Sequence, residues 1–237
     1  MTPKGDEYRE NFKESRHSAV KSMILSQKFI PPLTLNVDID MSEILKTQRK
    51  LKTLEKGSEN SFSSTSFIIK AISLALKDYP KLNSYYDPKS HQLVVKAAHH
   101  MGVARETSEG VVVPVMYNVN KMSLKGISNS MQEMIDRLRN GLVKEQDLQG
   151  STITVSNFGT IGATNSTPII MYPNTAAIGF NKIIRKPIAI KGDNIRVRSI
   201  MNFAITVDQR VIDAADAGMF LTRIKDLLEK PELITLS

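Results

Sequence analysis

A charged segment near the C-terminus is the part of the sequence best suited to chemistry. Residues 205–217 read Ile-Thr-Val-Asp-Gln-Arg-Val-Ile-Asp-Ala-Ala-Asp-Ala, so a strand would end in Asp208-Gln209-Arg210 and a helix would begin near Asp213. On spacing alone, the segment favours a structural corner in which an Asp and an Arg form an ion pair and an Asp caps the helix.

The other reactive residue types form no recognisable constellation. His99 and His100 are adjacent, so on a strand they would point to opposite faces and could not chelate one ion. His17 and His91 lie in polar surroundings typical of surface residues. The chain has no Cys, so a thiol in any reaction would have to belong to the ligand. We therefore expect no metal site.

Periodic segments predict the elements that position these residues. Residues 33–40 and 152–156 alternate apolar and polar side chains, as half-buried strands do, and the second strand leads into Gly159 and Gly162. These two glycines permit a positive φ or a close approach of the backbone. Helical stripes are predicted in the ranges 44–54, 67–76, 124–138 and 217–228. Because strands and helices do not alternate strictly, the expected fold class is α+β, a mixed sheet covered by helices.

Composition restricts the organisation and the partners. The chain has 237 residues with a net charge of +8, and we divide it into a polar tail or linker end at 1–14 and one core domain at 15–237. Scattered basic residues and few aromatic residues argue against nucleic acid. The exception is 182–198, which carries six Lys or Arg and predicts either a solvated hairpin or a site for a phosphorylated or acidic partner. No apolar run is long enough for a signal peptide or a membrane span, so we expect a cytoplasmic or mitochondrial matrix protein that is not secreted.

Five collinear motifs resemble one family, the catalytic core of the dihydrolipoamide acyltransferase component of 2-oxoacid dehydrogenase complexes. The segment 208–214 resembles that family's D-H-R-x-x-D-G signature. Four further segments resemble family motifs in the same order: 16–26 (R-K-x-I-A-K-x-M-x-x-S), 80–83 (P-x-L-N), 110–115 (G-L-V-V-P-V) and 152–159 (T-F-T-I-S-N-x-G).

The resemblance implies a chloramphenicol acetyltransferase-like fold, a homotrimer with its active site between subunits, and a larger core. It also implies acyl transfer between lipoyl-lysine and coenzyme A, without a metal. The family's His removes the thiol proton, and a Ser at the position of Ser156 donates to the oxyanion. The paired Arg and Asp of the family further imply an ion pair between Arg16 and Asp213.

The sequence departs from the family where the base should be. Gln209 occupies the His position, and an amide can hydrogen-bond a thiol but cannot hold its proton. Ala214 replaces the following Gly and would distort the corner if that position needed a positive φ. Arg105 stands where the family tends to an apolar residue, and Pro32 replaces a His.

Two interpretations follow. The first is a catalytically silent structural core subunit, similar to the dihydrolipoamide dehydrogenase-binding relative of the acyltransferase, which could mix with an active acyltransferase subunit and the other subunits of the complex. The second is an active acyltransferase in which a substitute base acts or Gln209 is an engineered change.

We also expect the apolar run 233–236 to be exposed on its own chain and to insert into a neighbouring trimer.

Overall fold

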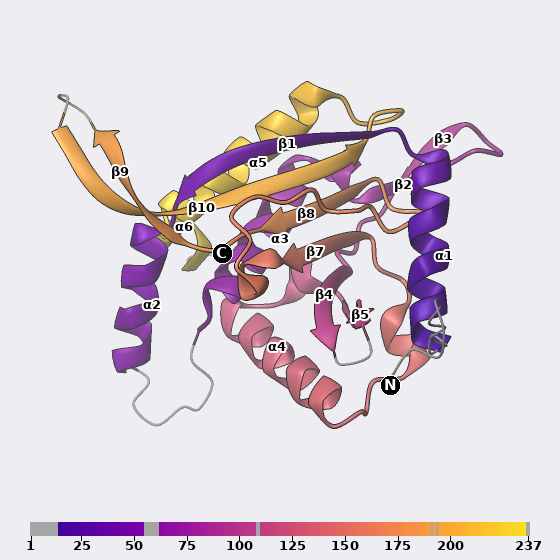
Figure 1. Cartoon of the computed structure of the whole chain (residues 1–237), viewed down its shortest axis with the longest axis horizontal. Helices are drawn as coiled ribbons and strands as arrows, with labels where there is room; N and C mark the ends of the chain where they lie inside the picture. Colours follow the sequence, from indigo (N-terminus) through magenta and orange to yellow (C-terminus); the bar gives the residue numbers. More distant parts are fainter. Residues whose placement is uncertain (1–13, 55–61, 108–109, 191, 193, 236–237) are drawn as a thin grey trace, which may run out of the picture.

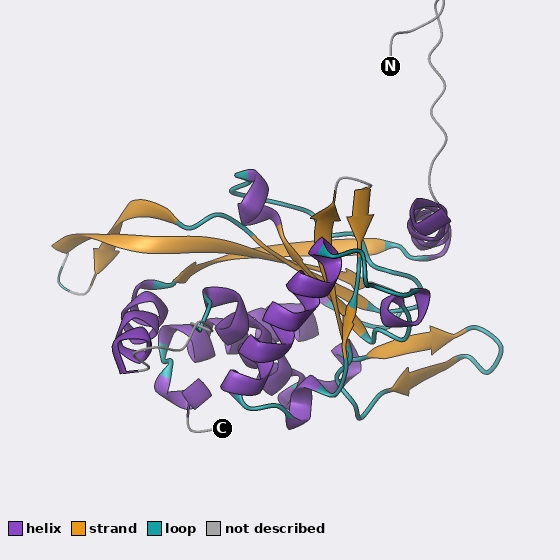
Figure 2. Cartoon of the chain, turned by 90° about the horizontal axis from the view of Figure 1, so that it is seen from below, coloured by secondary structure: helices purple, strands orange, loops and turns teal. Residues whose placement is uncertain are grey.

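The fold is a twisted mixed sheet with most of its helices on one face. The computed structural model describes residues 14–54, 62–107, 110–190, 192 and 194–235, with side chains from Val20 onward. Figure 1 shows the long strands crossing the molecule, and Figure 2 shows α3, α4 and α5 gathered below the sheet while α1 stands at one end. The predicted fold class, a mixed sheet with helices, is confirmed.

The main sheet has eight strands in the described part of the chain. Its order is β1-β10-β8-β7-β4-β5, with β6 beside β4 and β9 beside β10. Strands β4, β7 and β8 run parallel to one another, and the other pairs are antiparallel. The strand bounds are β1 Pro32–Asp40, β4 Met101–Thr107, β5 Gly110–Val112, β6 Val115–Met116, β7 Ile153–Asn157, β8 Ala176–Phe180, β9 Ile184–Ile190 and β10 Asn194–Asp208; a separate hairpin consists of β2 Ser84–Asp87 and β3 Gln92–Val95.

The helices begin largely where the sequence predicts. Ser63 caps α3 by accepting a hydrogen bond from the backbone N–H of Ser66 at 3.1 Å, and Ser123 caps α4 in the same way. The α-helices are α1 Glu14–Phe29, α2 Ser42–Leu54, α3 Ser64–Asp78, α4 Leu124–Arg139, α5 Ala214–Glu229 and α6 Glu232–Thr235; short 3₁₀ turns are η1 Pro80–Leu82, η2 Val119–Lys121, η3 Glu145–Leu148 and η4 Phe158–Ile161.

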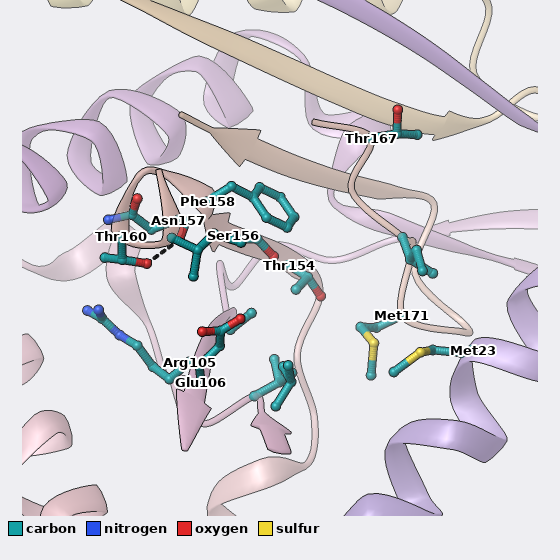
Figure 3. A pocket seen from close by; sticks show the side chains of 15 residues that line it. Met23, Arg105, Glu106, Thr154, Ser156, Asn157, Phe158, Thr160, Thr167 and Met171 are labelled. Carbon is teal, nitrogen blue, oxygen red and sulfur yellow. Dashed lines mark hydrogen bonds between the residues drawn. The ribbon is translucent and has the colours of Figure 1, made fainter. Parts of the chain in front are cut away.

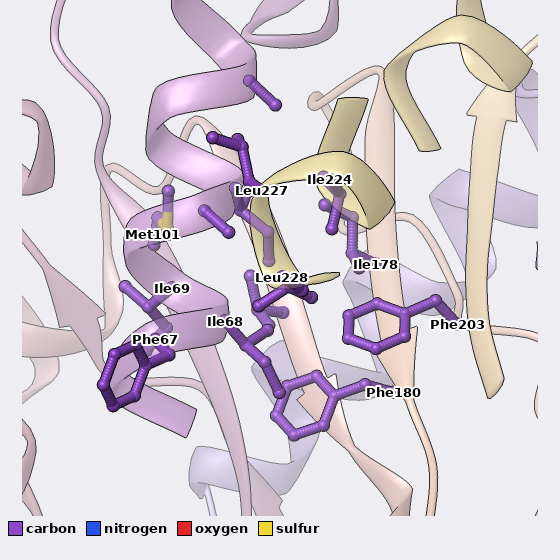
Figure 4. Close-up of a cluster of buried hydrophobic side chains, with 14 of the residues drawn as sticks. Phe67, Ile68, Ile69, Met101, Ile178, Phe180, Phe203, Ile224, Leu227 and Leu228 are labelled. Carbon is purple, nitrogen blue, oxygen red and sulfur yellow. The ribbon is translucent and has the colours of Figure 1, made fainter. Parts of the chain in front are cut away.

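Strand alternation decides which side chains enter the core and which face the opposite side. On β7, Ile153 and Val155 are buried in the large cluster beneath α3 and α5, so Thr154 and Ser156 face the other way. Phe180 and Phe203 stack across neighbouring strands in this cluster, which Figure 4 shows against the helices. The helix-covered face therefore stabilises the fold, and the opposite face of the β7 end is left for a site.

The periphery contains one interrupted strand and one expectation that the structure corrects. The run 110–115 divides at Val113-Pro114 into β5 and β6, because proline cannot donate a ladder hydrogen bond. The C-terminal expectation was wrong for Ile234, which α6 buries completely in the chain's own core. Leu233 is 42% exposed, and Leu236 lies outside the described residues.

The basic segment 182–198 forms the projecting β9–β10 hairpin. Lys186 forms an ion pair with Asp38 at 2.8 Å, and Arg198 lies 3.6 Å from Asp40, so β1 neutralises part of the charge. This arrangement agrees with the solvated-hairpin interpretation. None of the helices in the described ranges is long and apolar enough to cross a membrane.

Candidate active site

The corner after β10 is built on an ion pair whose carboxylate is buried. Asp208 is 1% exposed and accepts from the Nε and Nη2 atoms of Arg210 at 2.9 and 2.6 Å, as well as from the Arg210 backbone N–H at 3.1 Å. This bidentate pair raises the pKa of the Arg210 guanidinium. The predicted Asp/Arg ion-pair corner is therefore present in the chain.

Gln209 lies on the outside of this corner. Its backbone N–H donates to the carbonyl of Pro31 at 3.1 Å, which ties the corner to the connection between α1 and β1, while its side chain is exposed. The Arg210 guanidinium stacks 4.8 Å from the ring centre of Tyr86, on the β2–β3 hairpin. The backbone around Gln209 is thus fixed, and its amide faces solvent in the single chain.

Asp213 caps the last long helix. Its carboxylate accepts from the backbone N–H of Asp216 at 2.7 Å, as an N-cap residue does. Ala214 is the first residue of α5. Among the described residues other than glycine, a positive φ occurs at His91 and Asn118 and not at Ala214. The Cβ of Ala214 therefore causes no strain at the corner.

Ser156 lies at the end of β7 and lines a cavity of about 420 Å³. It is half-buried between Ala104 on β4 and Gly179 on β8, which are its partners in the parallel sheet. Figure 3 shows Ser156, Thr154 and Asn157 along β7, with Met23 of α1 and Met171 on the opposite side of the cavity. The cavity makes the Ser156 region accessible to a small ligand.

The two glycines after β7 hold the rim of this cavity. A Cβ on Gly159 would lie 2.9 Å from the carbonyl carbon and oxygen of Asn181, and Gly162 has φ +85°. Asn157 accepts from the backbone N–H of Gly159 at 3.0 Å and so starts η4. Close approach and positive φ, the two predicted uses of these glycines, both occur.

One chain does not bring Ser156 and Gln209 together. Val207 pairs with Ala176 on β8, whereas Ser156 pairs with Gly179 farther along the same strand. Gln209 therefore lies about five residues, or roughly 16 Å, along the strands from the level of Ser156. A site that used both residues would need a second copy of the chain.

The predicted partner of Asp213 lies on the N-terminal turn of α1. The side chain of Arg16 is outside the described residues, so the ion pair stays a prediction. Residue 16 precedes Phe29 by 13 positions, which corresponds to about 20 Å of helix rise. Because the Phe29 end adjoins Gln209, an Arg16–Asp213 pair would also have to join two copies.

Each of the three histidines whose side chains the structure describes is paired with a neighbouring group, and the side chain of His17 lies outside the described residues. His99 is 5% exposed, its Nδ1 lies 2.9 Å from the Ser73 hydroxyl, and burial lowers its pKa to about 4. His100 accepts the backbone N–H of Asn118 on Nδ1 at 3.1 Å, which leaves the proton on Nε2. His91 pairs with the hydroxyl of Tyr86 at 2.9 Å.

The cavity also contains residues that sequence reasoning did not identify as functional. The sequence predicts Thr154 only as part of a strand, and Arg105 stands out only as a departure from an apolar pattern, yet both residues line the cavity with Ser156. The alternation of β7 could have revealed Thr154, which shares the face of Ser156. The described residues contain no group of three or more His, Cys, Asp or Glu arranged to hold a metal ion.

Comparison with known proteins defines the class. Residues 4–236 match the family 2-oxoacid dehydrogenases acyltransferase (catalytic domain), and the chain belongs to this family.

Curated relatives agree with the family. The chain is 31% identical to the lipoamide acyltransferase component of the branched-chain alpha-keto acid dehydrogenase complex of Pseudomonas aeruginosa, over 93% of this chain and 51% of the relative. It is 34% identical to the succinyltransferase component of the 2-oxoglutarate dehydrogenase complex of Bacillus subtilis, over 93% of this chain and 53% of the relative. The chain thus spans about half the length of these relatives.

Solved structures give the same architecture. The dihydrolipoamide acetyltransferase of Azotobacter vinelandii matches with a TM-score of 0.91 at 26% identity, covering 97% of this chain and 94% of that one. The cubic core of a pyruvate dehydrogenase multienzyme complex matches with a TM-score of 0.91 at 27% identity, covering 97% and 94%. Chloramphenicol acetyltransferase, at 14% identity and a TM-score of 0.57, shares the fold.

Proposed function

We propose that the chain is a core subunit of a 2-oxoacid dehydrogenase complex that is catalytically silent and structural. The observation that carries this proposal is Gln209, which stands at the corner where transfer of a thiol proton would need a base. A thiol with a pKa of about 8.5 is only a few per cent ionised at pH 7, and a carboxamide cannot accept its proton.

The spacing of residues in one relative supports the assignment of this corner. In the Azotobacter vinelandii enzyme, a serine, a histidine and an asparagine were investigated for roles in the catalytic mechanism, and that histidine and asparagine are four residues apart. Gln209 and Asp213 have the same spacing. The proposal therefore assigns Gln209 to the base position, Asp213 to the residue beside it, and Ser156 to the oxyanion donor.

The assembly we propose is a homotrimer within a larger core. The roughly 16 Å between the levels of Ser156 and Gln209 supports a site shared by two copies. The likeness to a cubic core supports further assembly. In such a core the silent chain would mix with active acyltransferase subunits, and the ion pair of Arg16 and Asp213 would tie copies together.

Arg16→Ala should then lower the melting temperature of the assembly, whereas Arg9→Ala should not.

Restoring the base tests the silence directly. Purified chain and the Gln209→His variant are assayed for acetyl transfer from acetyl-CoA to dihydrolipoamide, with Gln209→Asn as a control that changes the side chain without adding a base. We expect at least a hundredfold gain for His and none for Asn. Because Ala214 is unstrained, adding Ala214→Gly should give no further gain. No gain in any variant would contradict the assignment of Gln209.

One contact favours a second candidate function, an active acyltransferase that uses coenzyme A and lipoyl-lysine as substrates. Tyr86 joins the His91 imidazole to the corner, because its hydroxyl pairs with His91 and its ring lies beneath Arg210. His91 would then be the substitute base. In that case the unmodified chain is active, and His91→Gln removes the activity while leaving assembly intact.

A further inference from the structure

A second cavity, of about 700 Å³, lies where β7 begins, whereas Ser156 lies where β7 ends. It is bordered by α1, the β2–β3 hairpin and the segments before β7 and β8, and Figure 1 and Figure 2 show α1 and the hairpin at the same end of the molecule. The lining includes Lys96 and His100, and none of the described residues that line the cavity is acidic. This cavity therefore has a positive wall that the acyltransferase site does not use.

Strand register places His100 on the face of the sheet that carries this cavity. Met101 and Ile153 pair at the start of the β4–β7 ladder, and both are buried in the core. The residues just before them, His100 and Thr152, therefore face the opposite side of the sheet. The Nδ1 atom of His100 accepts the backbone N–H of Asn118, and the N–H at Nε2 donates to no described residue.

Asn83 holds Lys96 beside the same face. Its Nδ2 atom donates to the carbonyl of Lys96 at 2.7 Å, and its Oδ1 atom accepts from the hydroxyl of Thr152 at 2.5 Å. The Lys96 ammonium lies 5.0 Å from the centre of the Tyr85 ring, which also lines the cavity, and forms no ion pair with a described residue. Lys96 thus supplies a cation that no carboxylate of the described chain neutralises.

Ser151 supplies a third donor in a fixed position. Its Oγ atom accepts from Nδ2 of Asn174 at 3.2 Å, and Asn174 is only 4% exposed. The hydroxyl proton of Ser151 is donated to no described residue. The side chain of Gln149, also in the lining, donates to the carboxylate of Glu145 at 3.3 Å and so occupies that acceptor.

Three separate donors beside a cation suit a phosphate monoester. A carboxylate is matched best by the paired N–H groups of one guanidinium, whereas Lys binds phosphate as a point charge. The three terminal oxygens of a phosphate monoester can each accept one hydrogen bond. The walls also include the rings of Tyr85 and Tyr172, against which a flat apolar group can pack.

We infer that this cavity binds a small phosphate monoester with a flat apolar body, with Lys96, His100 and Ser151 holding the phosphate and the two tyrosine rings bordering the body. Binding needs no base, so the inference goes beyond the proposed function, and either one can fail without the other.

Calorimetric titration of the intact chain tests the inference with three probes. Phenyl phosphate has both parts of the ligand, benzoate replaces the phosphate with a carboxylate, and benzyl alcohol is the neutral match. We expect phenyl phosphate to bind about tenfold more tightly than benzoate, and benzyl alcohol to bind most weakly. Saturating acetyl-CoA should leave the binding of phenyl phosphate unchanged. Displacement by acetyl-CoA, or equal binding of the three probes, would overturn the inference.

Variants separate a phosphate held in the cavity from general attraction to a basic chain. Lys96→Met should weaken the binding of phenyl phosphate about tenfold and Ser151→Ala about threefold, as expected for a charge-assisted and a neutral hydrogen bond. Lys89→Met removes the same charge at an exposed lysine in the turn between β2 and β3, outside the cavity lining, and should leave binding unchanged. Equal losses in the two lysine variants, or no loss in either, would overturn the inference.

Discussion

The corner after β10 and the cavity at the end of β7 treat buried polar groups in opposite ways. In the corner, the buried carboxylate of Asp208 accepts hydrogen bonds from the Arg210 guanidinium and backbone. In the cavity, the Nε atom of Arg105 and the hydroxyl of Thr154 are buried without partners. The difference teaches that a satisfied buried group stabilises the chain, whereas an unsatisfied group beside a cavity is suited to a ligand.

The largest stability effect should come from unpairing the corner. Arg210→Met leaves the buried carboxylate of Asp208 without its counter-ion, and removal of one partner of a buried pair costs about 3 kcal/mol, the low end of the usual range because the backbone N–H of residue 210 still donates to Asp208. Urea unfolding of the purified chain measures the loss. A loss of less than about 0.5 kcal/mol in the free energy of unfolding would remove the contrast with the Arg105→Met variant, which we expect to stabilise the protein because it removes an unpaired buried group.

A pH effect separates His99 from any role as a substitute base. Its pKa is about 4 in the folded chain and 6.5 in the unfolded chain, so the unfolded state binds more protons between these values. Stability should be fully present above pH 6.5 and fall by about 1–3 kcal/mol as the pH drops toward 4. The His99→Gln variant should lose this component of the pH dependence. If its profile of stability against pH were the same as that of the unmodified chain, the lowered pKa of His99 would be contradicted. His91→Gln, at an exposed site, serves as the control.

The rim of the cavity should tolerate no added methyl group at Gly159. In Gly159→Ala the new Cβ would contact the backbone of Asn181, and overpacking of this kind costs about 1–3 kcal/mol. Thermal unfolding measures this cost. At Gly126, in contrast, a Cβ would meet its nearest neighbour at an ordinary distance of 3.4 Å, so Gly126→Ala should be neutral or stabilising. Equal effects at both positions would contradict the close approach.

The smallest effect concerns the helix cap at the corner. Asp213→Ala removes the hydrogen bond to the Asp216 backbone and should cost about 1 kcal/mol in urea unfolding. Asp213→Asn keeps a capping oxygen and should cost less. If Asn costs as much as Ala, the charge of Asp213 matters more than its cap, as an ion pair with Arg16 would require.

Local sequence signals predicted the elements well, because each depends on neighbouring residues. The alternation of 33–40 predicted β1, the helical stripe 67–76 predicted α3, and the Asp and Arg of 208–210 predicted the ion-pair corner. The motifs identified the family before the comparison with known proteins.

Properties that depend on distant contacts could not be read in the same way. The burial of Ile234 depends on α6 turning back onto the core, and the distance between Ser156 and Gln209 depends on strand register. That Arg105 has no partner became visible only when its surroundings were known. Spacing along the chain does not contain this information.

The pH dependence of acetyl transfer by the unmodified chain tests the central claim most directly. If Gln209 leaves the site without a base, any rate from acetyl-CoA to dihydrolipoamide depends on thiolate formed in solution. The rate should then rise about tenfold per pH unit up to a thiol pKa near 8.5. At neutral pH it should stay at least a hundredfold below that of Gln209→His. A rate near that of the His variant, with a plateau at neutral pH, would contradict the claim.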